Sequence, residues 1–98
     1  MTPEEHVLSC LAEECAEVAH RVSKALRFGV KEVQHGQVKN NAERIADELN
    51  DLRGVVELLL EMGVLPSQPA AASNFAVQQK KNKVRDYMNY ARAVGTVT

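Results

Sequence analysis

The sequence predicts an all-α protein, and its periodicity and composition both indicate that class. Apolar residues recur every three to four positions in three long segments, and no segment has the alternating pattern of a β-strand. Apolar residues make up 45% of the 98 residues but aromatic residues only 4%, which is typical of an aliphatic, alanine-rich helical core. We therefore expect a single helical domain over residues 1–98, built as a bundle of three to four helices.

Capping residues predict where the first helix begins and ends. Thr2 is a good N-cap, Pro3 suits the first helical position, and the helix should stop near Phe28 and Gly29. The expected inward-facing residues are Leu8, Leu11, Cys15, Val18, Val22 and Leu26.

Two further helices are expected after a loop over residues 29–40. The second should start at an Asn40 or Asn41 cap and end at Gly63, and the third should run from between Ala70 and Phe75 to about Val94. The apolar stripe of the second helix consists of Ile45, Leu49, Leu52, Val56 and Leu59. The stripe of the third helix consists of Val77, Val84, Met88 and Ala91.

Composition also limits the partners and the compartment that we expect. The net charge of −1 does not favour nucleic acid or an anionic membrane, and no apolar run is long enough to cross a membrane. Cys10 and Cys15 point in different directions on one helix, so we expect free packing thiols and a cytoplasmic protein. Three narrow stripes make a small core, which favours completion of the bundle by a second copy.

Two acidic motifs lie on the first two predicted helices. At about 100° per residue, Glu14 lies roughly 80° from the centre of its apolar stripe, and Glu17 roughly 140° to the same side. Glu48 and Asp51 have the same two offsets on the second helix. If the helices pack antiparallel, the four carboxylates could converge at one edge of the contact, and such a set of oxygens suits Mg²⁺ or Mn²⁺. Either acidic pair alone is equally typical of a solvated helix face.

The remaining charged residues have weaker patterns. Lys80, Lys83 and Tyr87 share one flank of the third stripe, where they could contact phosphates or simply cover an apolar edge. Arg21 follows Glu17 by one turn and Arg44 precedes Glu48 by one turn, and local salt bridges explain both.

Glu13-Glu14-x-x-Glu17 followed by Glu48-x-x-Asp51 resembles the EExxE…ExxD signature of the all-α nucleotide pyrophosphohydrolases. The nearest branch is MazG, with dimeric dUTPases and phosphoribosyl-ATP pyrophosphohydrolase as relatives, and the resemblance covers roughly residues 5–94. It implies a homodimer or homotetramer that uses Mg²⁺ to cleave nucleoside triphosphates into the monophosphate and pyrophosphate.

The resemblance also implies a role for individual residues. By position, the metal ligands would be Glu14, Glu17, Glu48 and Asp51. Glu13 would assist, for example by orienting the water. Lys83 and Tyr87 best match the residues that would contact the substrate phosphates, and Lys80 is the next best match.

Two other functions remain open. A helical dimerisation or adaptor module could keep the fold without a catalytic site. A di-iron carboxylate bundle would use the ExxH spacing of Glu17 and His20, but His20 points away from the stripe and the second helix has no matching motif.

Overall fold

The computed structural model describes all 98 residues and contains three α-helices and no strand, which confirms the all-α class. Helix α1 spans Pro3–Phe28, α2 spans Asn41–Glu61 and α3 spans Ala70–Ala93. The chain divides into two compact units, Met1–Pro66 with α1 and α2, and Ser67–Thr98 with α3. The expectation of a single domain over residues 1–98 stays a prediction.

Helix α1 begins and ends as its capping residues predict. The Thr2 hydroxyl accepts a hydrogen bond from the Glu5 amide, and the Glu5 carboxylate accepts one from the Thr2 amide, both at 3.1 Å. This reciprocal pair satisfies two amides that would otherwise lack helical partners. At the other end Gly29 has φ 102°, a value that side chains disfavour, and its amide donates to the Ala25 carbonyl.

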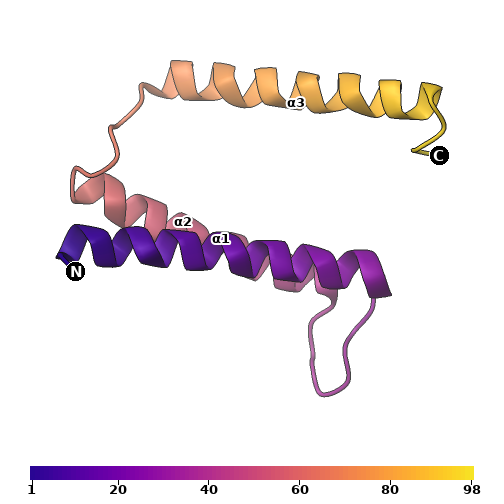
Figure 1. Ribbon diagram of the computed structural model, residues 1–98, viewed down its shortest axis with the longest axis horizontal. Helices are drawn as coiled ribbons and strands as arrows, with labels where there is room; N and C mark the ends of the chain where they lie inside the picture. Colours follow the sequence, from indigo (N-terminus) through magenta and orange to yellow (C-terminus); the bar gives the residue numbers. More distant parts are fainter. The chain divides into compact units, whose positions relative to one another are not determined.

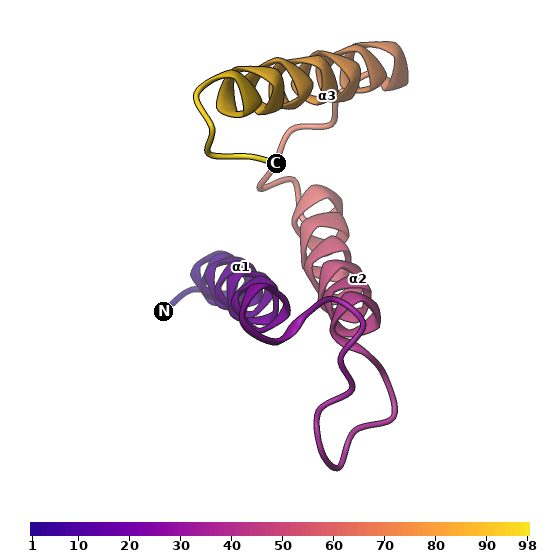
Figure 2. The ribbon, with the colours of Figure 1, turned by 90° about the vertical axis from the view of Figure 1, so that its right-hand side faces the viewer.

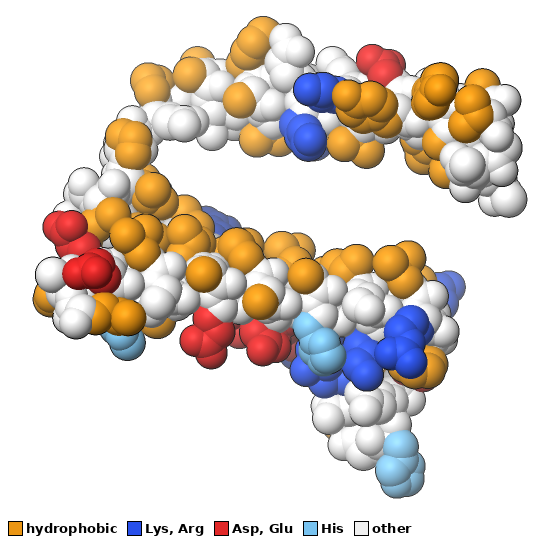
Figure 3. All heavy atoms as spheres, viewed as in Figure 1, with side chains coloured by type: hydrophobic (Ala, Val, Ile, Leu, Met, Phe, Trp, Pro, Cys, Tyr) orange, Lys and Arg blue, Asp and Glu red, His pale blue; other side chains and the backbone are white.

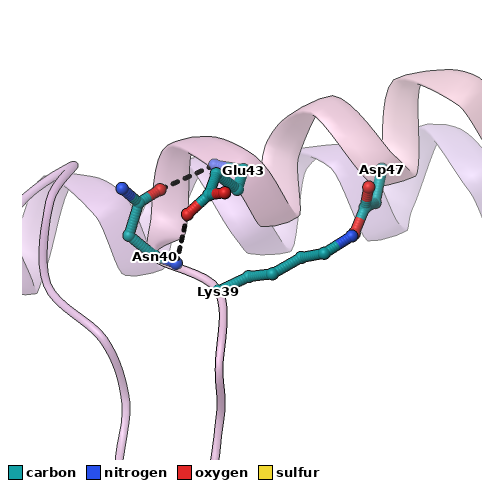
Figure 4. A network of polar contacts seen from close by, with 4 residues as sticks. All are labelled: Lys39, Asn40, Glu43 and Asp47. Carbon is teal, nitrogen blue, oxygen red and sulfur yellow. Dashed lines mark hydrogen bonds and ion pairs between the residues drawn. The ribbon is translucent and has the colours of Figure 1, made fainter.

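Helix α2 has the same kind of start. The Asn40 side chain accepts from the Glu43 amide at 2.8 Å, and the Glu43 carboxylate accepts from the Asn40 amide at 3.1 Å. Lys39, the residue before this cap, forms an ion pair with Asp47 about two turns into the helix, with 2.8 Å between Nζ and Oδ2 (Figure 4). The structure therefore selects Asn40 as the cap, and the helix ends two residues before Gly63, which has φ 72°.

Helices α1 and α2 form an antiparallel hairpin, and Figures 1 and 2 show them side by side. Its buried residues are few: Ala25, Asn41 and Leu59. The half-buried residues of α1 are Val7, Cys10, Leu11, Glu14, Val18, Arg21 and Lys24. Those of α2 are Arg44, Ile45, Glu48, Leu52, Val55 and Val56. Each helix therefore packs through one continuous face.

The packing faces differ from the predicted stripes. On helical-wheel geometry, the packed face of α1 is rotated roughly 80° from the predicted stripe toward Glu14, and that of α2 roughly 40° toward Glu48. Leu11 and Val18 are half-buried as expected. The rotation leaves the other four residues of the predicted α1 stripe exposed in the hairpin, facing away from α2: Leu8, Cys15, Val22 and Leu26.

The rotation leaves an apolar strip on the hairpin surface. Leu49 and Leu60 of α2 are exposed, as is Leu26 of α1, whose side chain is 82% accessible. In Figure 3 hydrophobic side chains line one long edge of the hairpin, whereas charged side chains lie along the other. We call the exposed apolar set the free strip: Leu8, Cys15, Val22, Leu26, Leu49 and Leu60.

Helix α3 contains no buried residue. Val77, Val84 and Met88 of its predicted stripe are exposed and Ala91 is half-buried. Its start at Ala70 follows Pro69, which supplies no side-chain cap. None of the three helices combines the length and the apolar character needed to cross a membrane.

The loop between α1 and α2 is held by Asn41. Its side-chain amide donates to the Gly29 carbonyl at 2.8 Å and to the Glu32 carboxylate at 3.1 Å, and its own amide donates to the Glu32 carbonyl. Asn41 is 3% accessible, so few of these polar atoms can find water instead. This residue fixes how the loop returns to the start of α2.

We expect Asn41→Ala to lower the free energy of unfolding by about 1–3 kcal/mol, because two acceptors lose a buried donor. Asn41→Asp should lower the free energy of unfolding further, since it brings a carboxylate toward both acceptors. Urea denaturation followed by circular dichroism measures both changes. Asn50→Ala is the matched control on the exposed side of α2, and a loss equal to that of Asn41→Ala would contradict the role of Asn41.

Candidate metal centre

Three carboxylates from two helices meet in the hairpin. Glu14 of α1 and Glu48 and Asp51 of α2 each offer an oxygen, and these oxygens lie within 4.8 Å of one another. Glu14 and Glu48 are half-buried, whereas Asp51 is exposed at the rim. We call these three residues the carboxylate cluster.

The cluster is placed by the rotated packing of the two helices. Glu14 and Glu48 are both within roughly 40° of the centre of their packed faces, and Asp51 lies one turn after Glu48. The sequence predicted that matched flanks would meet at an edge. The structure instead brings Glu14 and Glu48 into the middle of the contact and leaves Asp51 at its edge.

One oxygen of Glu14 is enclosed without a partner. Its Oε2 atom is inaccessible and has no hydrogen-bond partner. A buried carboxylate oxygen with no donor is costly, because it loses its water and gains nothing in return. A cation or a proton would satisfy such an atom beside two other carboxylates.

The electrostatics agree with this geometry. Desolvation raises the pKa of Glu14 above its usual range, and the negative charges of Asp51, Glu48, Glu13 and Glu17 raise it further. In the absence of a cation, the folded protein therefore holds a proton at Glu14 more readily than the unfolded chain does.

Glu17 and Glu13 lie outside the cluster. Both are exposed on α1, and they approach Glu14 closely enough to raise its pKa. The structure thus brings together three of the four predicted ligands, and the ligand role of Glu17 stays a prediction. His20 is exposed and is not one of the cluster residues, so the di-iron alternative gains no support from the cluster.

The predicted phosphate contacts Lys80, Lys83 and Tyr87 lie on α3, in the other unit, and all three are exposed. A surface groove of α3 includes both lysines but not the tyrosine: Phe75, Ala76, Gln79, Lys80, Asn82, Lys83 and Asp86. Their role in substrate binding stays a prediction.

The prediction that Arg21 and Arg44 form local salt bridges on their own helices was wrong. The ion pairs of the structure join Lys39 to Asp47 and Arg53 to Glu57. Arg21 is half-buried with no ion pair, and Arg44 donates to the neutral Gln34 side chain at 2.9 Å. The sequence did contain a sign of another role: Arg21 follows Glu14 by seven residues, and Arg44 precedes Asp51 by seven.

The donor set of the cluster fits a hard divalent cation. It consists only of carboxylate oxygens, the ligands that Mg²⁺ and Mn²⁺ prefer, and it lacks the nitrogen and sulfur ligands typical of zinc. Glu14, Glu48 and Asp51 are the residues that would hold the ion. A cation there would supply the missing partner of the Glu14 oxygen.

We expect Glu14→Gln to raise the melting temperature of the metal-free protein at neutral pH. The pKa of Glu14 is higher in the folded state, so stability falls as pH rises from the usual glutamate range through the raised value. Above that window the penalty is complete, and glutamine removes it. Below the usual range both states bind the proton, so the advantage of the variant should vanish.

Thermal denaturation in EDTA at pH 7.5 and pH 4 measures this difference. Glu13→Gln is the matched control, because Glu13 is the exposed neighbour on the same helix and should give a much smaller shift. An equal stabilisation by Glu14→Gln at both pH values would contradict the electrostatic explanation.

Comparisons of the chain with protein-family models, with curated proteins and with solved structures give no match. The resemblance to the MazG branch therefore stays an expectation that depends on the two acidic motifs alone.

Proposed function

We propose that the protein is a Mg²⁺-dependent nucleotide pyrophosphohydrolase, which cleaves nucleoside triphosphates between the α and β phosphates. The observation that carries this proposal is the enclosed, unpartnered oxygen of Glu14 within 4.8 Å of oxygens from Glu48 and Asp51. The EExxE…ExxD spacing, which resembles that of the all-α pyrophosphohydrolases, adds support from the sequence.

In this proposal the carboxylates act together. Glu14, Glu48 and Asp51 hold the ion, and Glu17, one turn from Glu14, is a further ligand from the rim. When bound, Mg²⁺ offsets the charge of the phosphates and lowers the pKa of a coordinated water. Exposed Glu13 orients the attacking water. One water is consumed as the bond between the α and β phosphates breaks, which gives the monophosphate and pyrophosphate.

The free strip supports a second part of the proposal, homo-oligomerisation. A contiguous set of exposed Leu and Val side chains along a helical hairpin favours burial against another apolar surface. A second copy offers the same strip, and a two-fold arrangement would match each strip with its own counterpart. We propose a homodimer that buries this strip, which can pair further into a homotetramer.

We expect Glu48→Gln or Asp51→Asn to reduce Mg²⁺-dependent pyrophosphate release by about 100-fold or more, since each removes a charged ligand. The assay uses the purified protein with Mg²⁺ and a panel of ribo- and deoxyribonucleoside triphosphates. Circular dichroism checks that the helices are retained.

Glu61→Gln is the control for charge on α2, because Glu61 is exposed at the far end of the helix. It should leave pyrophosphate release unchanged. Pyrophosphate release that persists in the Glu48 and Asp51 variants would contradict the proposed site. A dimeric wild-type protein with no release and no Mg²⁺-induced rise in melting temperature would instead be a helical dimerisation module.

We expect Val22→Glu to shift the oligomer toward the monomer, because Val22 belongs to the free strip and a buried unpaired charge is costly. Light scattering after size-exclusion chromatography measures the molar mass. Ser23→Glu is the control, since Ser23 is exposed on α1 away from the strip. A monomeric wild-type protein would rule out this use of the strip.

A further inference from the structure

Three cations lie near the carboxylate cluster in the hairpin. Arg21 and Lys24 follow Glu14 and Glu17 by two turns on α1, and Arg44 precedes Asp51 by two turns on α2. Because the helices are antiparallel, all three lie toward the same end of the hairpin, the end joined by the loop (Figure 1). Along the charged edge in Figure 3, acidic side chains give way to basic ones in this direction.

These cations share an environment that favours an anionic ligand. All three are half-buried, and none takes part in an ion pair. Arg44 donates to a neutral amide, and the Lys24 ammonium lies 5.7 Å from the centre of the Phe28 ring. Partly desolvated charges without a counter-ion attract an anion more strongly than solvated surface charges do.

The spacing suits a chain of phosphates. Seven residues of helix separate Glu14 from Arg21, which is about 10 Å along the axis. An arginine side chain and two or three linked phosphates together cover that length. Guanidinium groups bind phosphate oxygens in pairs, and lysine contributes a point charge.

We propose that Arg21, Lys24 and Arg44 form a phosphate-binding edge of the hairpin, which holds the β and γ phosphates of the substrate. This inference rests on the proposed function, and it assigns the polyphosphate chain of the substrate to these three residues. The β and γ phosphates, which leave together as pyrophosphate, are the groups that this edge binds. Pyrophosphate should therefore inhibit competitively, and the monophosphate only weakly.

The test uses inorganic tripolyphosphate and the intact protein. Isothermal titration calorimetry in EDTA at low ionic strength measures binding without metal. The double variant Arg21→Gln/Arg44→Gln should bind at least about tenfold more weakly than wild type, since two charge-assisted contacts are lost. Arg21→Lys/Arg44→Lys should recover part of the affinity, because the charges return without the paired donors.

Arg53→Gln is the matched control, because it removes an exposed arginine of α2 that pairs with Glu57. Wild-type affinity in this variant supports the edge, whereas an equal loss would mean that only net charge matters and would overturn it. The absence of tripolyphosphate binding by wild type, or unchanged binding by the double glutamine variant, would also overturn the proposal.

Kinetics separate this inference from the proposed function. The double glutamine variant should raise the KM for a triphosphate at least tenfold and leave the Mg²⁺-induced shift in melting temperature intact. If wild type releases no pyrophosphate but the variant still loses tripolyphosphate binding, the enzyme proposal fails and the phosphate-binding edge stands. If hydrolysis occurs with an unchanged KM in the variant, the edge fails and the enzyme proposal stands.

Discussion

The contact between α1 and α2 decides where every other group of the first unit lies. Its centre holds two carboxylates, Glu14 and Glu48, in positions where aliphatic side chains would give more stability. One Glu14 oxygen is enclosed without a donor, and burial together with the negative charges around it raises the pKa of Glu14. A hairpin whose only task was to fold would gain by replacing these groups. The conflict is resolved when a cation lies among the carboxylates, as the proposed function requires.

The same contact accounts for the free strip. The helices turn roughly 80° and 40° away from their apolar centres, so each packs through a mixed face and leaves leucine and valine outside. Only Ala25 and Leu59 are buried apolar residues, which is a small core for a hairpin of this length. In the proposed homodimer, burial of the strip against a second copy would offset the energetic cost of the carboxylates.

Local signals in the sequence were enough to place the helices. Thr2 and Asn40 cap through their own side chains, and Gly29 adopts a backbone angle that other residues disfavour, so each boundary depends on one or two neighbouring residues. The rotation of α1 against α2 could not be obtained in this way. Periodicity gives the angles between residues on one helix, but a broad apolar arc leaves open which part of it meets the partner.

The carboxylate cluster was predictable because its two motifs occupy equivalent flanks, and three of the four predicted ligands converge. The burial of the Glu14 oxygen and the exposure of Cys15 could not be predicted, since both depend on the rotation of the helices. Glu17 shows the limit of spacing arguments. It lies three residues from Glu14 on the same helix, yet only one of the two faces the other helix.

Arg21 and Arg44 show why an isolated helix is a poor guide to charge pairing. An acidic residue one turn away gives a plausible salt bridge on a solvated helix, and such a pair contributes at most about 0.5 kcal/mol. In the hairpin Glu48 turns into the helix contact while Glu17 stays exposed, and the arginines are left half-buried with no ion pair. Opposite charges that could neutralise each other are instead kept apart along one edge. That separation stabilises neither the hairpin nor its surface, but it matches a ligand that carries a cation at one end and anionic phosphates along its length.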